Sequence, residues 1–322
     1  MVIKNGRTFF KLKLVIVFGV FVLVWKGALQ KTKLEYSSQT DTTSKTVNTV
    51  GKVLHRNQAL GWTFDNKICF QKRDSSFVFA KLNNPPNTPI YVYPEELDQY
   101  ISRNISREGS YEGHNVQTLL QYMKQFPKAV FLDLGANIGA FSVPIAAHGY
   151  RVIAVECLRS NVMRLCASMN EANLANKMTI VYNALNQKHE KVSLVSAKGN
   201  IGMTAVVDQG KGNETIDSIL LDDLLEVFNL EQVVIKMDVL EQEDIVLNGG
   251  DEFFNKVRVE ALLMEFIHHQ NDDYNNDGKF IVDLLASHDL EPDVPEHLKH
   301  DYKNWETSEI LFKRMSREKK EM

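Results

Sequence analysis

The chain has few cysteines, no excess of basic residues and no long uncharged hydrophobic run. Its 322 residues include three cysteines, too few for a disulfide framework, and the odd number leaves at least one thiol unpaired within the chain. Cys166 falls on the apolar face of an expected helix, which favours a packed thiol. The formal net charge of −4 gives no electrostatic case for nucleic-acid binding, which usually shows a basic face.

The N-terminus carries the strongest apolar run, residues 14–25, which is shorter than the ~20 residues that span a bilayer comfortably. Extended to 14–29, with flanking lysines that snorkel, the segment would form a thin transmembrane anchor. Basic residues before it predict a cytoplasmic tail at 1–13 and a type II protein with a luminal body in the Golgi or endoplasmic reticulum. A cleaved signal peptide and a secreted protein remain the alternative, although Lys26 lies at the −3 position of the best cleavage site.

Residues 30–57 are rich in Ser, Thr, Lys and Gln and are predicted to form a flexible luminal stem. Two N-x-Ser/Thr sequons, at Asn104 and Asn213, agree with a luminal glycoprotein. The segment 58–128 is predicted to be an N-terminal extension that packs on the catalytic domain and forms part of its pocket. The residues after 313 are predicted to be a charged tail, 314–322.

From residue 129 to 313, short apolar runs alternate with amphipathic segments, which predicts an α/β domain with a mostly parallel sheet. The predicted strands are 129–134, 151–156, 178–182, 233–238, 259–266 and 309–312. The predicted helices are 139–148, 160–172, 218–228, one ending near 247, and 279–288. A hairpin-like polar stretch is expected at 191–207.

The run from Val130 to Ser142 predicts a buried strand, a tight turn and the start of a helix. Gly135 would allow the dihedral angles of the turn, and Gly139 would let a ligand or strand approach the helix closely. A dinucleotide fingerprint needs a glycine where this chain has Asn137, so an NAD-linked oxidoreductase is disfavoured. The loop therefore favours another nucleoside cofactor.

Ligands of open parallel sheets bind beyond the carboxyl ends of the strands, and each predicted strand brings a polar group there. Glu156 ends the second strand, where a carboxylate can accept hydrogen bonds from both ribose hydroxyls. Asn183 and Ala184 follow the third strand, at the expected nucleobase edge. Asp133 and Asp238 could hold the amino end of a methionine group or orient the substrate. Glu265 completes the set.

The chain strongly resembles the FkbM family of S-adenosylmethionine (SAM)-dependent methyltransferases over about residues 90–313. The resemblance is carried by FLDLGANIGAFS, VIAVECLRSNVMRLCASMNEAN, IDSILLDDLL and VVIKMDVLEQEDIVLNGG, in this order. It implies a class I, Rossmann-like methyltransferase fold with a seven-stranded sheet whose last strand is antiparallel. It also implies SAM as cofactor and methyl transfer to an oxygen of a small molecule or sugar.

The resemblance also assigns roles to single residues. Gly135, Asn137 and Gly139 would cradle the methionine part of SAM, Glu156 would hold the ribose, and Glu112 would face the cofactor. The family pattern after the fourth strand has a Glu-Gly pair where this chain has Leu240-Glu241. This departure leaves open a catalytically silent relative that serves as a binding or scaffold protein.

Methyl transfer from a sulfonium depends mainly on in-line approach and desolvation, and a general base helps when the acceptor is an alcohol. The candidate bases are Asp238, Glu243 and His268. No metal site is predicted, because residues 271–277 lack the calcium-loop pattern. The predicted function is thus a membrane-anchored O-methyltransferase acting on a small-molecule or glycan acceptor.

Overall fold

The computed structural model describes residues 52–84, 86–270 and 277–315. The chain divides into two compact units. Of the described residues, 52–225 and those from 229 onward belong to one unit, and Glu226–Phe228 belong to the second. The predicted cytoplasmic tail, 1–13, the anchor, 14–29, and most of the stem lie outside the described residues. None of the described helices is long and apolar enough to cross a membrane.

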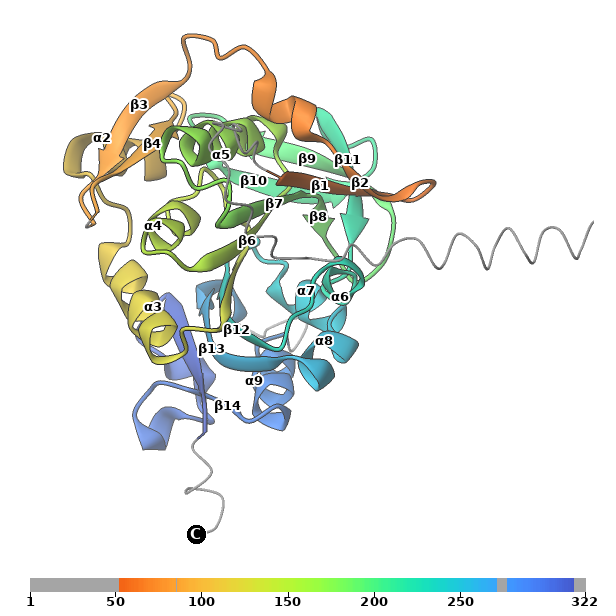
Figure 1. The fold of residues 1–322 in the computed structure, drawn as a ribbon. Coiled ribbons are helices and arrows are strands. Elements are labelled where there is room, and N and C mark those ends of the chain that lie inside the picture. Colours follow the sequence, from red (N-terminus) through yellow and green to blue (C-terminus); the bar gives the residue numbers. More distant parts are fainter. Residues whose placement is uncertain (1–51, 85, 271–276, 316–322) are drawn as a thin grey trace, which may run out of the picture. The chain divides into compact units, whose positions relative to one another are not determined.

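A nine-stranded sheet forms the centre of the unit (Figure 1). In spatial order it contains β14 (Leu290–Pro292), β15 (Glu309–Arg314), β13 (Arg258–Glu265), β12 (Gln232–Met237), β5 (Val130–Leu134), β6 (Arg151–Glu156), β7 (Met178–Tyr182), β1 (Lys52–Asn57) and β2 (Gly61–Phe64). The six strands from β13 to β1 are parallel, whereas β15 is antiparallel to β13.

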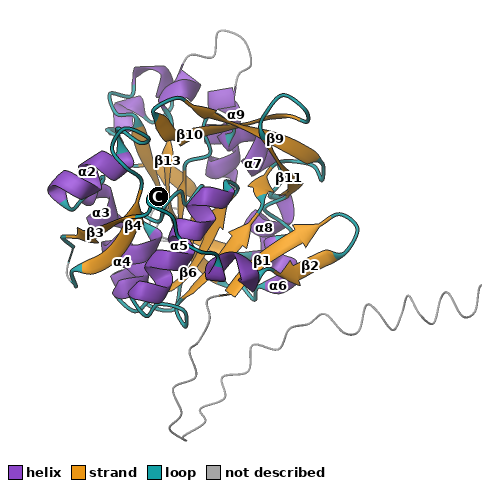
Figure 2. Ribbon diagram, turned by 90° about the horizontal axis from the view of Figure 1, so that it is seen from above, coloured by secondary structure: helices purple, strands orange, loops and turns teal. Residues whose placement is uncertain are grey.

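Seven strands of this sheet follow one another along the chain from β5: β5, β6, β7, β12, β13, β14 and β15. Numbered one to seven in that order, they lie across the sheet from β7 as 3, 2, 1, 4, 5, 7, 6. These seven strands agree with the expected sheet and its antiparallel last strand, whereas β1 and β2 extend the sheet beyond the expected seven strands. Its central strands are apolar runs because helices cover both faces. Figure 2 shows α3 (Gly113–Gln125), α4 (Ser142–Ala147) and α5 (Arg159–Glu171) on one side of the sheet. The other side carries α7 (Glu243–Asn248), α8 (Asp251–Lys256) and α9 (Asp277–Ser287).

A second, four-stranded sheet follows β7 and contains the predicted hairpin. Its order is β10 (Asn200–Asp208), β9 (Lys191–Ala197), β11 (Glu214–Ile219) and β8 (Ala184–Leu185). The predicted helix at 218–228 is wrong, since β11 ends at Ile219 and a helix, α6, covers only Leu224–Val227. A short apolar run fits both helix and strand periods, and here the pairing of Ile219 with Leu185 of β8 decides for the strand at the start of this run.

The N-terminal extension contains η1 (Asn66–Phe70), the hairpin of β3 (Val78–Leu82) and β4 (Thr88–Val92), and α2 (Ile101–Glu108). The predicted stem boundary at 57 is wrong, because residues 52–57 form β1, which adds to the edge of β7. Val53 and Leu54 supply the buried side chains that the polar composition of the preceding residues obscured. The predicted tail also starts too early, because β15 includes Arg314.

Three further 3-10 helices, η2 (Ile267–Gln270), η3 (Glu296–Leu298) and η4 (Tyr302–Asn304), lie between β13 and β15. The predicted packed thiol of Cys166 is instead half of a disulfide with Cys69, which joins α5 to η1. This bond connects residues 97 positions apart and fastens the extension to the central domain. Cys157 is the free cysteine.

Reduction of the Cys69–Cys166 disulfide should destabilise the protein measurably. Chain-entropy arguments and measured cases put the loss for a loop of this size at about 2–5 kcal/mol. We expect dithiothreitol to lower the urea midpoint of the wild type and of Cys157→Ala alike. The double variant Cys69→Ser/Cys166→Ser should start low and show no response. A wild-type midpoint that dithiothreitol leaves unchanged would contradict this expectation.

Candidate active site

A cavity of about 370 Å³ opens at the carboxyl ends of β5, β6, β12 and β13. The chain runs outward from β5 in one direction and from β12 in the other, so this edge is the switch point where open α/β sheets bind ligands. Of the sequence-predicted site residues, the cavity is lined by Asp133, Gly135, Asn137, Glu156, Asn183, Asp238, Glu265 and His268. The other four, Glu112, Gly139, Ala184 and Glu243, are not among its lining residues.

The loop after β5 lies directly against the loop after β12. Gly135 has a φ of +83°, and a Cβ there would lie 1.9 Å from the backbone oxygen of Asp238. The next positions are also fixed, because the backbone N–H groups of Gly135 and Ala136 both donate to the oxygen of Val155. Glycine is thus required at 135 by both its dihedral angle and its neighbour.

Gly139 has a different role from the one predicted. A Cβ on Gly139 would lie 2.6 Å from the Leu165 side chain of α5, so this glycine allows helix packing and is not part of the cavity wall. Asn137 adopts the left-handed conformation, and its backbone N–H donates to Glu156 at 2.8 Å. Its side-chain oxygen accepts from the N–H of Ile138.

Glu156 is buried at the end of β6 and held by three N–H donors. One carboxylate oxygen accepts from Asn137, and the other accepts from the Leu158 backbone at 2.7 Å and the Asn161 side chain at 3.3 Å. Burial raises the pKa of Glu156 to about 7 against these hydrogen bonds. A carboxylate offers about four lone pairs, so acceptor capacity remains on the side that lines the cavity.

Asp133 is also buried, and its carboxylate accepts a hydrogen bond from the Ser142 hydroxyl at 2.5 Å. Burial raises its pKa to about 6, opposed by the Ser142 bond and by Lys236. Asp133 therefore joins the start of α4 to the cavity floor.

A buried lysine, which the sequence analysis did not single out, stands at the centre of the charged groups. Lys236 Nζ lies 3.4 Å from Asp238 and 3.4 Å from Glu309 of β15. Burial disfavours its ammonium form, but the surrounding carboxylates, those of Asp238 and Glu309 foremost, outweigh this effect and raise its pKa. The carboxylates of Glu112 and of Asp133, the residue of β5 that the strand register pairs with Lys236, add to this effect.

Glu112 contacts this network from behind the cavity. The Asn115 amide bonds both Glu112 and Glu309, and burial raises the pKa of Glu309, with the Glu112 carboxylate adding to the effect. Glu112 therefore holds the network together, whereas the adjacent Tyr111 lines the cavity.

The two residues predicted at the nucleobase edge, Asn183 and Ala184, have structural roles. Asn183 lines the cavity, but its amide donates to the backbone oxygens of Arg56 and Asp217 and accepts from the Arg56 N–H. Ala184 is buried in β8. The walls at this end include side chains from β8 and the β10 hairpin, namely Leu185, Asn200, Met203, Thr204 and Val206. Sequence reasoning missed them because they come from a sheet whose position only the tertiary structure reveals.

The departure at 240–241 is a strained stretch of backbone, of which Leu240 lines the cavity. Leu240 and Glu241 both have positive φ, of 54° and 62°. Position 241 is where the family pattern has glycine, the residue that takes this conformation at no steric cost. The Glu241 side chain lies 3.2 Å from His268, and both side chains are largely exposed.

Glu243 is not at the cavity. It is 1% exposed, and its oxygens bond the Val239 N–H and the imidazole of His269, each at 2.9 Å. Its predicted role as a base is therefore replaced by that of holding the loop after β12. His268, by contrast, lines the cavity mouth between Glu241 and Glu265.

Comparisons with known proteins give short or distant matches, and no family model matches the chain. The 23S rRNA (uracil(1939)-C(5))-methyltransferase RlmD of Dichelobacter nodosus is 36% identical over 63 residues, 20% of this chain and only 15% of that protein. A T. thermophilus 16S rRNA N2 G1207 methyltransferase, solved with AdoMet and guanosine, aligns with a TM-score of 0.38 and 13% identity. The alignment covers 76% of this chain and 52% of that one.

The magnesium protoporphyrin IX methyltransferase of Synechocystis, solved with SAM, gives a TM-score of 0.35 at 11% identity, over 63% of this chain and 79% of that one. Similarities this low do not define the fold, which rests on the strand order and the antiparallel last strand. The fold is an α/β, Rossmann-like fold with a mostly parallel sheet. The narrower resemblance to the FkbM family stays a prediction, since no family model matches.

The strained loop generates a prediction about stability. Glu241→Gly should raise the free energy of unfolding by about 0.5–1 kcal/mol, because glycine removes the left-handed strain and the exposed ion pair it loses contributes little. The adjacent Gln242, with a φ of −115°, is the control: Gln242→Gly should destabilise by a similar amount. Both are measured by urea denaturation. A Glu241→Gly variant no more stable than Gln242→Gly would show that the loop is unstrained.

Proposed function

We propose that the protein is a SAM-dependent methyltransferase that methylates a hydroxyl oxygen of a small molecule or glycan. The observation that carries the proposal is the arrangement of Glu156 and the loop from Gly135 to Asn137. A buried carboxylate at the end of the second strand is tied to the glycine loop of the first, as recognition of a ribose requires.

The residues present fit the parts of SAM. Glu156 would accept from the ribose hydroxyls, and the side chains of Leu185 and Val206 offer apolar surface for the adenine. SAM is cationic at its sulfonium and amino groups, and the cavity presents the carboxylates of Asp133 and Asp238. An anionic pyrophosphate would find no such match, which favours SAM over a dinucleotide.

When bound, SAM supplies a methyl group on a positively charged sulfur. Asp238 is the group best placed to orient the acceptor hydroxyl and accept its proton, because it lines the cavity and stays partly exposed. Lys236, with its Nζ 3.4 Å away, fixes the position of this carboxylate. Apolar walls that include Phe141 and Leu240 would exclude water from the reacting atoms. His268 at the mouth is the second candidate base.

We further propose a luminal, membrane-anchored protein, with secretion after signal cleavage as the alternative. The Cys69–Cys166 disulfide supports an oxidising compartment, where such bonds persist. Both sequon asparagines, Asn104 and Asn213, are exposed and accessible to glycosylation. The net charge of −4 and the acidic cavity support an acceptor other than nucleic acid.

A second candidate function is that of a catalytically impaired binding protein. The observation in its favour is Leu240, an apolar residue on the cavity wall where the family pattern has glutamate. Such a protein would bind SAM and transfer no methyl group.

The deciding experiment combines SAM binding with transfer. The full-length protein is titrated with SAM by calorimetry and then incubated with labelled SAM and a panel of glycans and hydroxylated lipids. We expect binding, and a labelled product by mass spectrometry. Gly135→Ala should abolish both, because its Cβ meets the Asp238 oxygen.

Gly149→Ala is the matched control. Gly149 also has a positive φ, of +91°, but open space around its Cβ position, so this variant carries the backbone strain without the clash. It should bind SAM like the wild type. Absence of SAM binding by the wild type would contradict both functions, and binding without transfer to any acceptor would favour the impaired protein.

SAM affinity should increase with pH through neutrality. Ribose hydroxyls donate to the ionised carboxylate of Glu156, whose pKa is about 7 in the free protein, so affinity should rise about tenfold from pH 6 to pH 8. The stability of the free protein should change in the opposite direction. The pKa of Glu156 is higher in the folded than in the unfolded state, so the stability that this group contributes is lost as pH rises through 7.

The measurement is calorimetry at several pH values in buffers of different ionisation enthalpy. Glu156→Gln should bind more weakly and show a flatter profile between pH 7 and 8. Asp133, with a pKa of about 6, adds a dependence at the lower end. An affinity for the wild type that is constant from pH 6 to pH 8 would contradict the assigned role of Glu156.

A further inference from the structure

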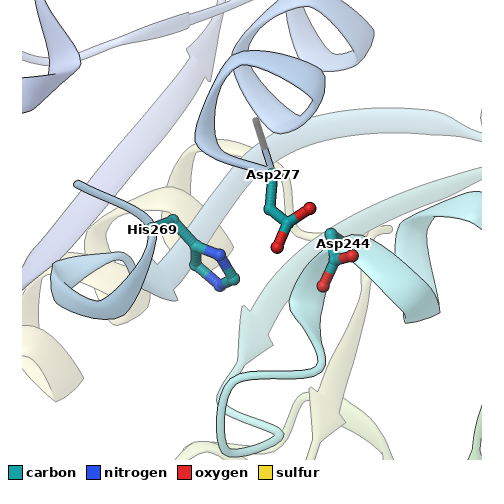
Figure 3. A group of neighbouring side chains, drawn as sticks. All are labelled: Asp244, His269 and Asp277. Atoms are coloured by element: carbon teal, nitrogen blue, oxygen red, sulfur yellow. The ribbon is translucent and has the colours of Figure 1, made fainter. Parts of the chain in front are cut away.

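Three side chains with metal-binding atoms meet behind the wall of the cavity. Asp244 comes from α7, His269 from η2 and Asp277 from the first residue of α9, and one ligand atom of each lies within 4.8 Å of the other two. Figure 3 shows the imidazole edge of His269 turned toward the carboxylate of Asp277, with Asp244 beyond it. One imidazole and two carboxylates are a donor set that divalent transition metals take in proteins.

His269 is held in the tautomer that a metal ligand needs. The ring is 5% exposed, and its Nε2 lies 2.9 Å from the buried carboxylate of Glu243. A carboxylate accepts, so Nε2 carries a proton, and Nδ1 is the ring nitrogen whose lone pair a metal ion would take. Among the described residues Nδ1 makes no hydrogen bond. A histidine oriented by a carboxylate on its far nitrogen is the usual arrangement at metal sites.

Neither Asp244 nor Asp277 is paired with a lysine or arginine among the described residues, 52–84, 86–270 and 277–315. Both are only partly exposed. Burial, with the Asp277 carboxylate adding to it, raises the pKa of Asp244. Two neighbouring carboxylates repel each other unless a cation lies between them.

The arrangement is fixed by packing. A Cβ on Gly278 would lie 2.2 Å from the backbone oxygen of His269, so α9 can begin against η2 only with glycine at this position. The ring of Phe266 packs on His269 at 5.7 Å and on Trp305 at 4.7 Å between centroids. The three side chains therefore converge as part of a packed structure.

We propose that Asp244, His269 and Asp277 bind one divalent transition-metal ion of the Zn²⁺ type, with water completing its coordination. Calcium and magnesium prefer all-oxygen sites, and the imidazole favours zinc. The ion would join α7, η2 and α9. It would be bound whether or not the cavity accepts SAM.

The site is connected to the cavity through one residue. Glu243 bonds His269 with one oxygen and the Val239 N–H with the other, and Val239 lines the cavity. An ion on His269 would thus stabilise the loop after β12 at its strained residues, Leu240 and Glu241. Its role would be structural, because the ion lies outside the cavity wall.

The test uses full-length protein stripped of metal with a chelator and then titrated with ZnCl₂. We expect one Zn²⁺ per chain by calorimetry and a melting temperature that rises with zinc. Asp244→Asn and Asp277→Asn should each weaken zinc affinity at least about tenfold. Without zinc, neither variant should melt below the wild type, because each removes one of two repelling carboxylates.

Two neighbouring positions provide controls. His268→Gln alters the adjacent, exposed histidine, and Asp283→Asn alters an exposed aspartate of α9 that pairs with Lys279. Both should bind zinc like the wild type. The proposal is overturned if the wild type binds no zinc or if the Asp244 and Asp277 variants bind it equally well. It is also overturned if both variants melt lower while zinc has no effect, since His269 would then itself be the neutralising cation.

Discussion

The contact between Gly135 and the backbone oxygen of Asp238 is the constraint on which the site depends. It lets the loops after β5 and β12 touch, and the register of these two strands then sets Asp133 beside Lys236. Any side chain at 135 would separate the loops and widen the floor of the cavity. The absence of a Cβ at Gly135 therefore sets the distance between the loop after β5 and the loop after β12.

The charges of the site follow from the burial of Lys236. A buried ammonium must be paired, and here its partners are Asp238, directly after β12, and Glu309 of β15. Asn115 of α3 reaches the same group by bonding Glu309 and Glu112. The N-terminal extension and the last strand are thus electrostatic components of the cavity, although few of their side chains line it.

Two adjacent histidines show how one residue step separates two environments. His268 lies half-exposed at the cavity mouth, whereas His269 is buried against Phe266 and bonded to Glu243. Glu243 joins both regions, since its second oxygen holds the loop that carries Leu240. A residue predicted to be a base therefore acts as a positioning residue. The residues with positive φ, Leu240 and Glu241, therefore lie in the loop that Glu243 holds through the Val239 N–H.

The sequence by itself determined the strands from β5 to β7, β12, β13 and β15, the glycine loop and Glu156, because hydrophobic period and turn chemistry are local properties. Tertiary structure decided the rest. The amide of Asn183 bonds Arg56 of β1, which is 127 residues away. The sequence predicted the hairpin of the second sheet, but only packing places this sheet against the cavity. The ion-pair partners of Lys236, the disulfide of Cys166 and the convergence of Asp244 with His269 likewise depend on residues brought together only when the chain packs.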